Sequence, residues 1–464
     1  MIACMSRFLD MTSAPAEYAN DTDFTPSETL VTTPSQATLP RSGSHAEPRD
    51  RFRFFQYVLL LYLFFYCSRV SELISGMRFA VILLPILVIG LFLSGRSKVI
   101  LGMPCGKALI AFTIWVALCV PTSLWHSDSV RVLRSNLIAL LIVVMMATFI
   151  RTVHDSFRLM YTIGLSMGLV AIVGLVLKRG GSSVRLGLGE TATLKDPNFF
   201  CLYVLVGICF LSLSVSVHKG FKRLLSMGLI VLCLGAAARS GSRMGLVAFA
   251  ITVLMFFIFG NTRQRICLAV GCLLLAAALP SLLPQTVKAR FLTLFQTGEG
   301  GTQQDIAAAK GAAESAVLRR QLFFDGLQYT LENPLFGVGP GQFMQAEVEH
   351  AHEQYRKALW LYPHNTYTET SSETGVVGIV LFLVAFLGAQ VGLRRIRKYG
   401  PDLLTRRMAL FLHLALIVVT LCAFFLTLGY SGLIWVLIGA SGTFQLAVAR
   451  QVKLFQAHQG NQVR

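Results

Sequence analysis

One histidine stands where an imidazole could take part in catalysis. His364 follows Pro363, precedes Asn365, and lies ten residues before an apolar segment that starts at residue 374. The proline restricts the backbone on one side of the imidazole, and the asparagine offers an amide on the other. A neutral imidazole, with a pKa of about 6.5, can accept a proton from a hydroxyl group near neutral pH. We therefore interpret His364 as a general base, with a loop-capping role as the alternative.

The residues after His364 could support it. Glu369 and Glu373 lie close enough in the sequence to orient the imidazole or to compete with it as the base. Gly375 and Gly378 lie one helical turn apart, a spacing that allows close packing between helices. We expect these four residues to shape the outer end of the apolar segment.

Two arginines flank a short turn at the start of another apolar segment. Arg239 and Arg243 enclose the sequence Ser-Gly-Ser. Backbone N–H groups at a helix start attract anions, and guanidinium groups bind pairs of phosphate oxygens. The turn therefore favours a diphosphate whose lipid tail lies in the membrane. The alternative is that both side chains contact anionic lipid headgroups.

Polar residues before the apolar segment at 199–217 extend this predicted anion site. Lys195, Asp196 and Asn198 surround a proline. Asp and Asn commonly cap helices and proline is common in the first turn, so a purely structural role is equally open. Arg185 precedes the sequence Leu-Gly-Leu-Gly, whose glycines could let the backbone approach a ligand. We include Arg185 among the diphosphate-binding candidates.

The composition shows where these residues must be held. The chain has 464 residues, of which 54% are hydrophobic and only 14% are charged. Soluble domains contain roughly 25% charged residues, so this chain is an integral membrane protein. The net charge of +18 resides in short basic clusters between apolar runs. Such clusters set membrane orientation, and we expect no nucleic-acid partner.

About twelve segments are apolar enough to span a membrane. They are approximately 54–71, 79–94, 108–125, 132–150, 159–177, 199–217, 224–238, 244–260, 266–283, 374–393, 408–428 and 431–448. Alternate loops between these segments are basic, which predicts that those loops and both termini are cytoplasmic. The long loop at 284–373 then lies outside.

The chain therefore divides into five predicted parts. They are a disordered cytoplasmic tail at 1–50, transmembrane helices 1–9 at 51–283, a periplasmic helical loop with His364 at 284–373, transmembrane helices 10–12 at 374–448, and a cytoplasmic C-terminal tail at 449–464. The tail is rich in Ser, Thr and Pro. The loop has helical periodicity near 303–332 and 342–360, so we predict an all-α membrane protein with a helical cap.

The spacing around His364 resembles the signature of a known family. His364-Asn365, nine residues, then Gly375-x-x-Gly378 is similar to a motif of the O-antigen ligase and polymerase superfamily of bacterial membrane glycosyltransferases. The upstream sequence Asn-Pro-x-x-Gly-x-Gly, at residues 333–339, is similar to a second motif. The resemblance covers residues from about 160 to 390 and implies the C-type glycosyltransferase architecture.

The resemblance extends to the polar turns. The Ser-x-Ser-Arg turn ending at Arg243 and the Asp-Pro-Asn sequence ending at Asn198 are similar to short family motifs. Arg320 matches an arginine that precedes the Asn-Pro motif. The resemblance therefore implies that Arg320 joins Arg239 and Arg243 in binding the diphosphate.

The resemblance implies en bloc transfer of a glycan from undecaprenyl diphosphate to an acceptor hydroxyl, on the outer face of the bacterial inner membrane. The motif spacing favours a ligase, with polymerase and protein oligosaccharyltransferase as alternatives. Arginine can neutralise a departing diphosphate, so we expect metal-independent, inverting transfer without a cofactor. The expected partners are the lipid-linked donor, a glycolipid or glycan acceptor, and the bilayer.

A polysaccharide transporter or lipid flippase is the alternative from another class. Such a protein would need polar residues deep within its spans, or internal repeats with broken helices. The polar residues of this chain gather instead at the predicted outer edge of the membrane. That distribution favours surface chemistry on a membrane-anchored donor.

Overall fold

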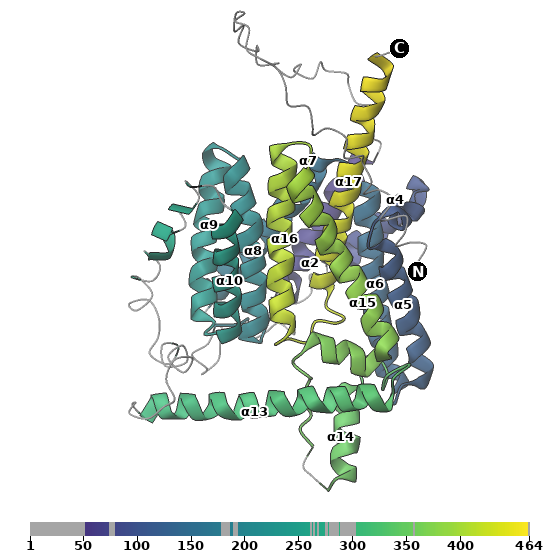
Figure 1. The fold of residues 1–464 in the computed structure, drawn as a ribbon, viewed down its shortest axis with the longest axis vertical. Coiled ribbons are helices and arrows are strands. Elements are labelled where there is room, and N and C mark those ends of the chain that lie inside the picture. Colours follow the sequence, from purple (N-terminus) through teal and green to yellow (C-terminus); the bar gives the residue numbers. More distant parts are fainter. Residues whose placement is uncertain are drawn as a thin grey trace, which may run out of the picture. The chain divides into compact units, whose positions relative to one another are not determined.

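The computed structural model describes residues 52–73, 79–177, 186–188, 194–259, 303–355 and 358–462, with a few isolated positions between 260 and 302. Every regular element in these ranges is helical (Figure 1). The predicted all-α class is therefore confirmed. The predicted tail at 1–50, Arg185, and more than half of the predicted span at 266–283 lie outside the described residues.

Seven described helices are long and apolar enough to cross a membrane. They are α6 (His126–Phe149), α7 (Val153–Leu177), α8 (Pro197–Val217), α9 (Gly220–Arg239), α15 (Thr366–Tyr399), α16 (Leu403–Ala423) and α17 (Gly432–Gln462). Shorter apolar helices accompany them, namely α2 (Arg53–Ser68), α4 (Phe79–Ser94), α5 (Gly106–Cys119) and α10 (Arg243–Phe259). The protein is a multi-pass membrane protein, and the count of twelve spans stays a prediction.

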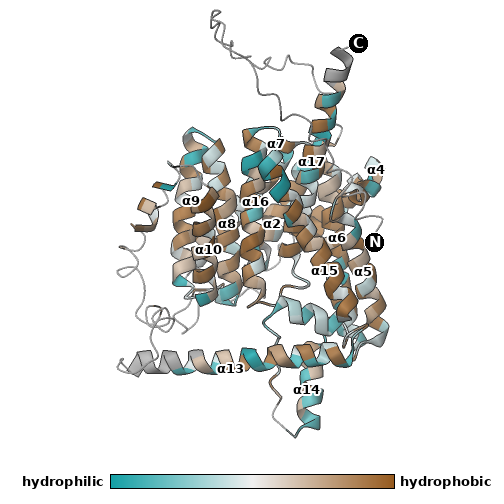
Figure 2. Cartoon of the chain, in the orientation of Figure 1, coloured by the Kyte–Doolittle hydropathy of each residue, from teal (hydrophilic) through white to brown (hydrophobic). Residues whose placement is uncertain are grey.

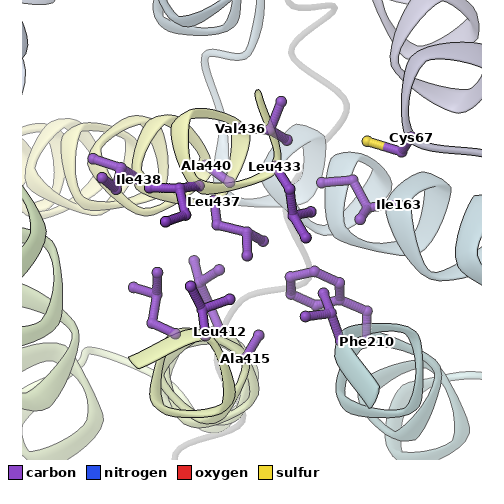
Figure 3. Close-up of a cluster of buried hydrophobic side chains, with 14 of the residues drawn as sticks. Cys67, Ile163, Phe210, Leu412, Ala415, Leu433, Val436, Leu437, Ile438 and Ala440 are labelled. Carbon is purple, nitrogen blue, oxygen red and sulfur yellow. The ribbon is translucent and has the colours of Figure 1, made fainter. Parts of the chain in front are cut away.

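The bundle has a close-packed aliphatic core. Helix α8 packs against α7, α9 and α16, and α17 packs against α6, α7 and α15. Figure 3 shows side chains of α16 and α17, including Leu412 and Leu437, converging beside Phe210 of α8; all three are fully buried. Other apolar side chains, such as Phe92 on α4 at 82% exposure, lie on the outside of the bundle. Figure 2 shows hydrophobic residues along the bundle helices and hydrophilic ones at their ends, as a lipid-facing surface requires.

Two arginines of the predicted cytoplasmic loop at 394–407 contact the ends of neighbouring helices. Arg407 donates a hydrogen bond from Nη1 to the Ser216 carbonyl at 3.1 Å. The Arg397 guanidinium lies 3.8 Å from the ring centroid of Phe259. These contacts join the last turns of α8, α10 and α15 and the first turns of α16 at one end of the bundle. The compartment of that end, and of both termini, stays a prediction.

The long loop contains the two helices that its periodicity predicts. Helix α13 (Gln303–Glu332) packs against α15, and α14 (Phe343–Glu353) contacts both. A small separate core unites them, formed by Leu322, Tyr329, Val338, Phe343 and Ala346. In Figure 1, α13 runs crosswise to the bundle helices. This arrangement sets one face of α13 against the helix starts that carry the predicted site.

Candidate functional site

A cavity of about 410 Å³ lies where α10, α13, the loop before α15 and the end of α16 meet. Its polar lining includes Arg243, Arg319, Arg320, His364 and Asn365. Its apolar lining includes Met244, Val247, Phe323, Phe424 and Phe425. The fold thus brings four predicted site residues, Arg243, Arg320, His364 and Asn365, to one cavity from three distant parts of the chain.

The backbone of His364 is held in an uncommon conformation. Its φ is +50°, in the left-handed region that few residues other than glycine adopt. The neighbouring Asn365 is the N-cap of α15, and its side-chain oxygen accepts hydrogen bonds from Tyr367 N at 2.9 Å and Thr368 N at 3.2 Å. The Asn365 side chain therefore fixes the start of α15. His364, half-buried, is left to line the cavity.

The surroundings of His364 favour its neutral form. Burial lowers the pKa of the imidazole below its ordinary value, and the positive charge of Arg319 lowers this pKa further. The carboxylate of Asp196 acts in the opposite direction with a smaller effect. The imidazole therefore stays able to accept a proton at a lower pH than a solvated histidine does.

The turn before α10 is fixed by two serine contacts. Ser242 Oγ accepts a hydrogen bond from Gly245 N at 3.1 Å and donates one to Asn198 Oδ1 at 2.8 Å. Asp196 in turn caps α8, because its Oδ1 accepts a hydrogen bond from Asn198 N at 2.7 Å. The Asp-Pro-Asn sequence therefore both caps a helix and holds the turn that presents Arg243.

The glycine-rich segment after α13 wraps around the start of α15. Gly337, Gly339 and Gly341 all have positive φ, at +69°, +109° and +76°. The carboxylate of Glu373 accepts hydrogen bonds from Gly341 N at 2.6 Å and Phe343 N at 3.1 Å. This segment positions α15 and does not line the cavity.

A known protein family matches the part of the chain that contains most of this cavity. Residues 228–383 match the O-antigen ligase family. These residues form an O-antigen ligase domain. Comparison with curated proteins gave no match. The family acts in membrane glycosyl transfer of the O-antigen ligase and polymerase type, with lipid-linked glycans as substrates.

The O-antigen ligase domain includes the turn from Arg239 to Arg243, helices α13 and α14, His364 and the start of α15. Two predicted residues, Arg239 and Lys195, are not part of the cavity lining. Arg239 ends α9, and its carbonyl accepts a hydrogen bond from Leu186 N at 3.1 Å. The Lys195 carbonyl faces Gly187 closely, so backbone occupies the space that we expected a ligand to approach.

The structure shows what surrounds the carboxylates and the glycines that follow His364 on α15. Glu369 accepts a hydrogen bond from Gly429 N at 2.9 Å, so both carboxylates of α15 bind backbone N–H groups rather than the His364 imidazole. Gly375 and Gly378 do not share a continuous helix face, because Gly375 has φ +69° and breaks α15. Gly378 packs against Trp115 of α5, as close helix packing requires.

Arg319 is a charged residue of the cavity lining that the sequence motifs do not mark. Ser315, Ala316, Arg319, Arg320 and Phe323 all line the cavity and recur at helical spacing on α13. Residues four apart share a helix face, so Ser315, Arg319 and Phe323 form one row and Ala316 and Arg320 form the next. The motif that marks Arg320 therefore does not by itself indicate Arg319.

Proposed function

We propose that this protein transfers a glycan en bloc from undecaprenyl diphosphate to an acceptor hydroxyl. The observation that carries the proposal is a cavity that joins the His364 imidazole to the guanidinium groups of Arg243 and Arg320. The imidazole can accept a hydroxyl proton, and the guanidinium groups can bind a diphosphate. The apolar wall from Met244 to Phe425 suits the first part of a lipid chain.

In the proposed reaction, the acceptor oxygen attacks the anomeric carbon of the sugar joined to diphosphate. His364 Nε2 or Nδ1 takes the hydroxyl proton as the new C–O bond forms. The bond from the anomeric carbon to the diphosphate oxygen breaks, and its electron pair leaves with the diphosphate. Arg243 and Arg320 stabilise that charge. Attack opposite the leaving group inverts the anomeric centre.

We assign the reaction to the outer face of the bacterial inner membrane. The charge pattern of the loops supports this assignment, since it places the α13–α14 cap opposite the basic loops. The same cavity chemistry would serve a polymerase, whose acceptor is a second lipid-linked glycan. A ligase uses a different glycolipid or glycan, so the acceptor separates the two.

The test is reconstitution of the purified full chain in lipid nanodiscs with a glycan-loaded undecaprenyl diphosphate donor. A glycolipid acceptor and a second donor molecule are offered in separate reactions. The proposal expects free undecaprenyl diphosphate and glycan joined to the glycolipid. Product only with the second donor indicates a polymerase. No product in either reaction, together with movement of donor across liposomes, would support a transporter instead.

A further inference from the structure

Arg319 occupies a particular place among the charges of the cavity. It lies half-buried on α13, on the face that carries Ser315 and Phe323, while its neighbour Arg320 is exposed. The Arg320 guanidinium lies 5.8 Å from the ring centroid of Phe324. Among the described residues, no carboxylate forms an ion pair with Arg319 within 4 Å. Within the described part of the chain, its charge therefore acts on the cavity without an ion-pair partner.

The charged groups that face His364 come from three elements. Arg319 and Arg320 extend from α13, and Arg243 extends from the start of α10. Asp196, at the cap of α8, interacts electrostatically with both His364 and Arg319. Its carboxylate is also engaged by Asn198 N. Positive charge therefore exceeds negative charge around the imidazole before any substrate binds.

A bound diphosphate changes this balance. Its negative charges, placed beside an imidazole in a partly buried site, favour the protonated ring. A protonated ring cannot act as a general base. The donor would therefore inhibit its own transfer unless a cation next to the imidazole opposes the effect.

We propose that Arg319 is a positioning residue that keeps His364 neutral while the donor diphosphate is bound, with Asp196 as the counter-charge that limits its effect. The inference rests on the proposed function, because it needs His364 as the base. It assigns separate tasks to adjacent residues: Arg320 binds the diphosphate, and Arg319 acts through the imidazole.

The first test is the pH dependence of transfer by the full chain in nanodiscs at saturating donor. The acid limb is the pH range in which the transfer rate rises with pH as His364 loses its proton. In Arg319→Gln, this limb should move to higher pH, so that the transfer rate at a given pH on the limb falls about tenfold per pH unit of displacement. Transfer at pH 8.5 should stay near wild type. Arg319→Lys should restore the wild-type limb because it keeps the charge. Arg320→Gln should weaken donor binding at every pH and leave the limb in place.

A second variant shifts the limb in the other direction. Asp196→Asn keeps an N-cap residue on α8 and removes the negative charge that favours the protonated imidazole. Its acid limb should move to lower pH. Opposite displacements in Arg319→Gln and Asp196→Asn are not expected from general loss of structure.

A measurement without catalysis separates this inference from the proposed function. Diethyl pyrocarbonate modifies neutral imidazole, and mass spectrometry of the peptide with His364 gives the labelling rate against pH. The inference expects the labelling midpoint and the transfer limb to move together in both variants. An unmoved midpoint in Arg319→Gln overturns it. A moved midpoint with full transfer by His364→Ala refutes His364 as the base, and the catalytic task of Arg319 with it.

Discussion

The cavity lining and the glycine-rich segment at 333–341 contain motifs of the same domain, but they differ in how their polar groups are hydrogen-bonded. The cavity presents guanidinium groups and an imidazole that are half-buried or exposed. The segment from Asn333 to Gly341 is fixed by backbone hydrogen bonds, such as Val338 N to Ser372 O and Val376 N to Pro334 O, both 2.8 Å. The first region leaves polar groups available, and the second satisfies them internally.

This difference separates the motif residues that hold the fold together from those that are free to meet a substrate. A buried carboxylate is costly unless hydrogen bonds compensate for its lost hydration, and Glu373 receives two from backbone N–H groups. A group that must meet a substrate keeps its hydrogen-bonding capacity free. Resemblance in motif therefore does not by itself say which residues do chemistry; the hydrogen-bond partners do.

The broadest expected effect, on stability as well as on activity, comes from breaking the rigid region at Gly375. Its φ is +69°, and an added Cβ would collide with the carbonyls of Pro334 and Leu335. Gly375→Ala should therefore cost more than about 1 kcal/mol of stability and lower both donor binding and transfer. Gly388→Ala is the matched control on the same helix, because an added Cβ there meets nothing within 4 Å. Thermal unfolding in detergent measures both; equal melting temperatures would contradict the account.

The next effect comes from removing a cation of the cavity wall. Arg243→Ala should weaken donor affinity by about 10- to 100-fold, since a hydrogen bond to a charged group contributes about 1.5–3 kcal/mol. The donor affinity of Arg243→Lys should lie between those of the wild type and Arg243→Ala, because a point charge does not reproduce bidentate contact. Arg131→Ala removes an arginine that is 78% exposed and paired with Asp128, and serves as the control. Donor titration by fluorescence separates the variants; equal affinity in Arg243→Ala favours headgroup contact.

The sequence predicts the part of this picture that depends on composition and local pattern. Apolar length predicts the bundle helices, and the type and setting of His364 and Arg243 predict two cavity residues. The roles of Glu373 and Gly375 depend on partners such as Gly341 and Leu335, which the fold brings close. Because helix periodicity alone does not state which face meets a neighbour, the cavity side of Arg319 also required the structure.

A smaller effect should follow from loosening the turn that presents Arg243. Asn198→Ala removes the acceptor of the 2.8 Å hydrogen bond from Ser242 Oγ. Such a bond contributes about 0.5–1.5 kcal/mol, so transfer should fall by roughly 2- to 10-fold. Transfer by Ser242→Ala should fall by a similar factor. The double variant should lose less transfer activity than the two single losses combined. Strict additivity in this double-mutant cycle would mean that the bond does not support activity.

The smallest effect is expected from metal removal. Because arginines supply the positive charge at the leaving diphosphate in the proposed reaction, transfer in excess EDTA should equal transfer in buffer alone. The assay is product formation over time in nanodiscs. Activity that disappears in EDTA and returns with added Mg²⁺ would contradict this expectation.

The most direct test compares donor binding with glycan transfer in His364→Ala. General acid–base assistance typically contributes 10²–10⁴-fold to the rate. Diphosphate binding by Arg243 and Arg320 does not depend on the imidazole. The account predicts that His364→Ala binds the lipid-linked donor with wild-type affinity and transfers glycan about 10²–10⁴-fold more slowly. Transfer at the wild-type rate would remove His364 from the mechanism, and loss of binding together with transfer would make it part of the scaffold.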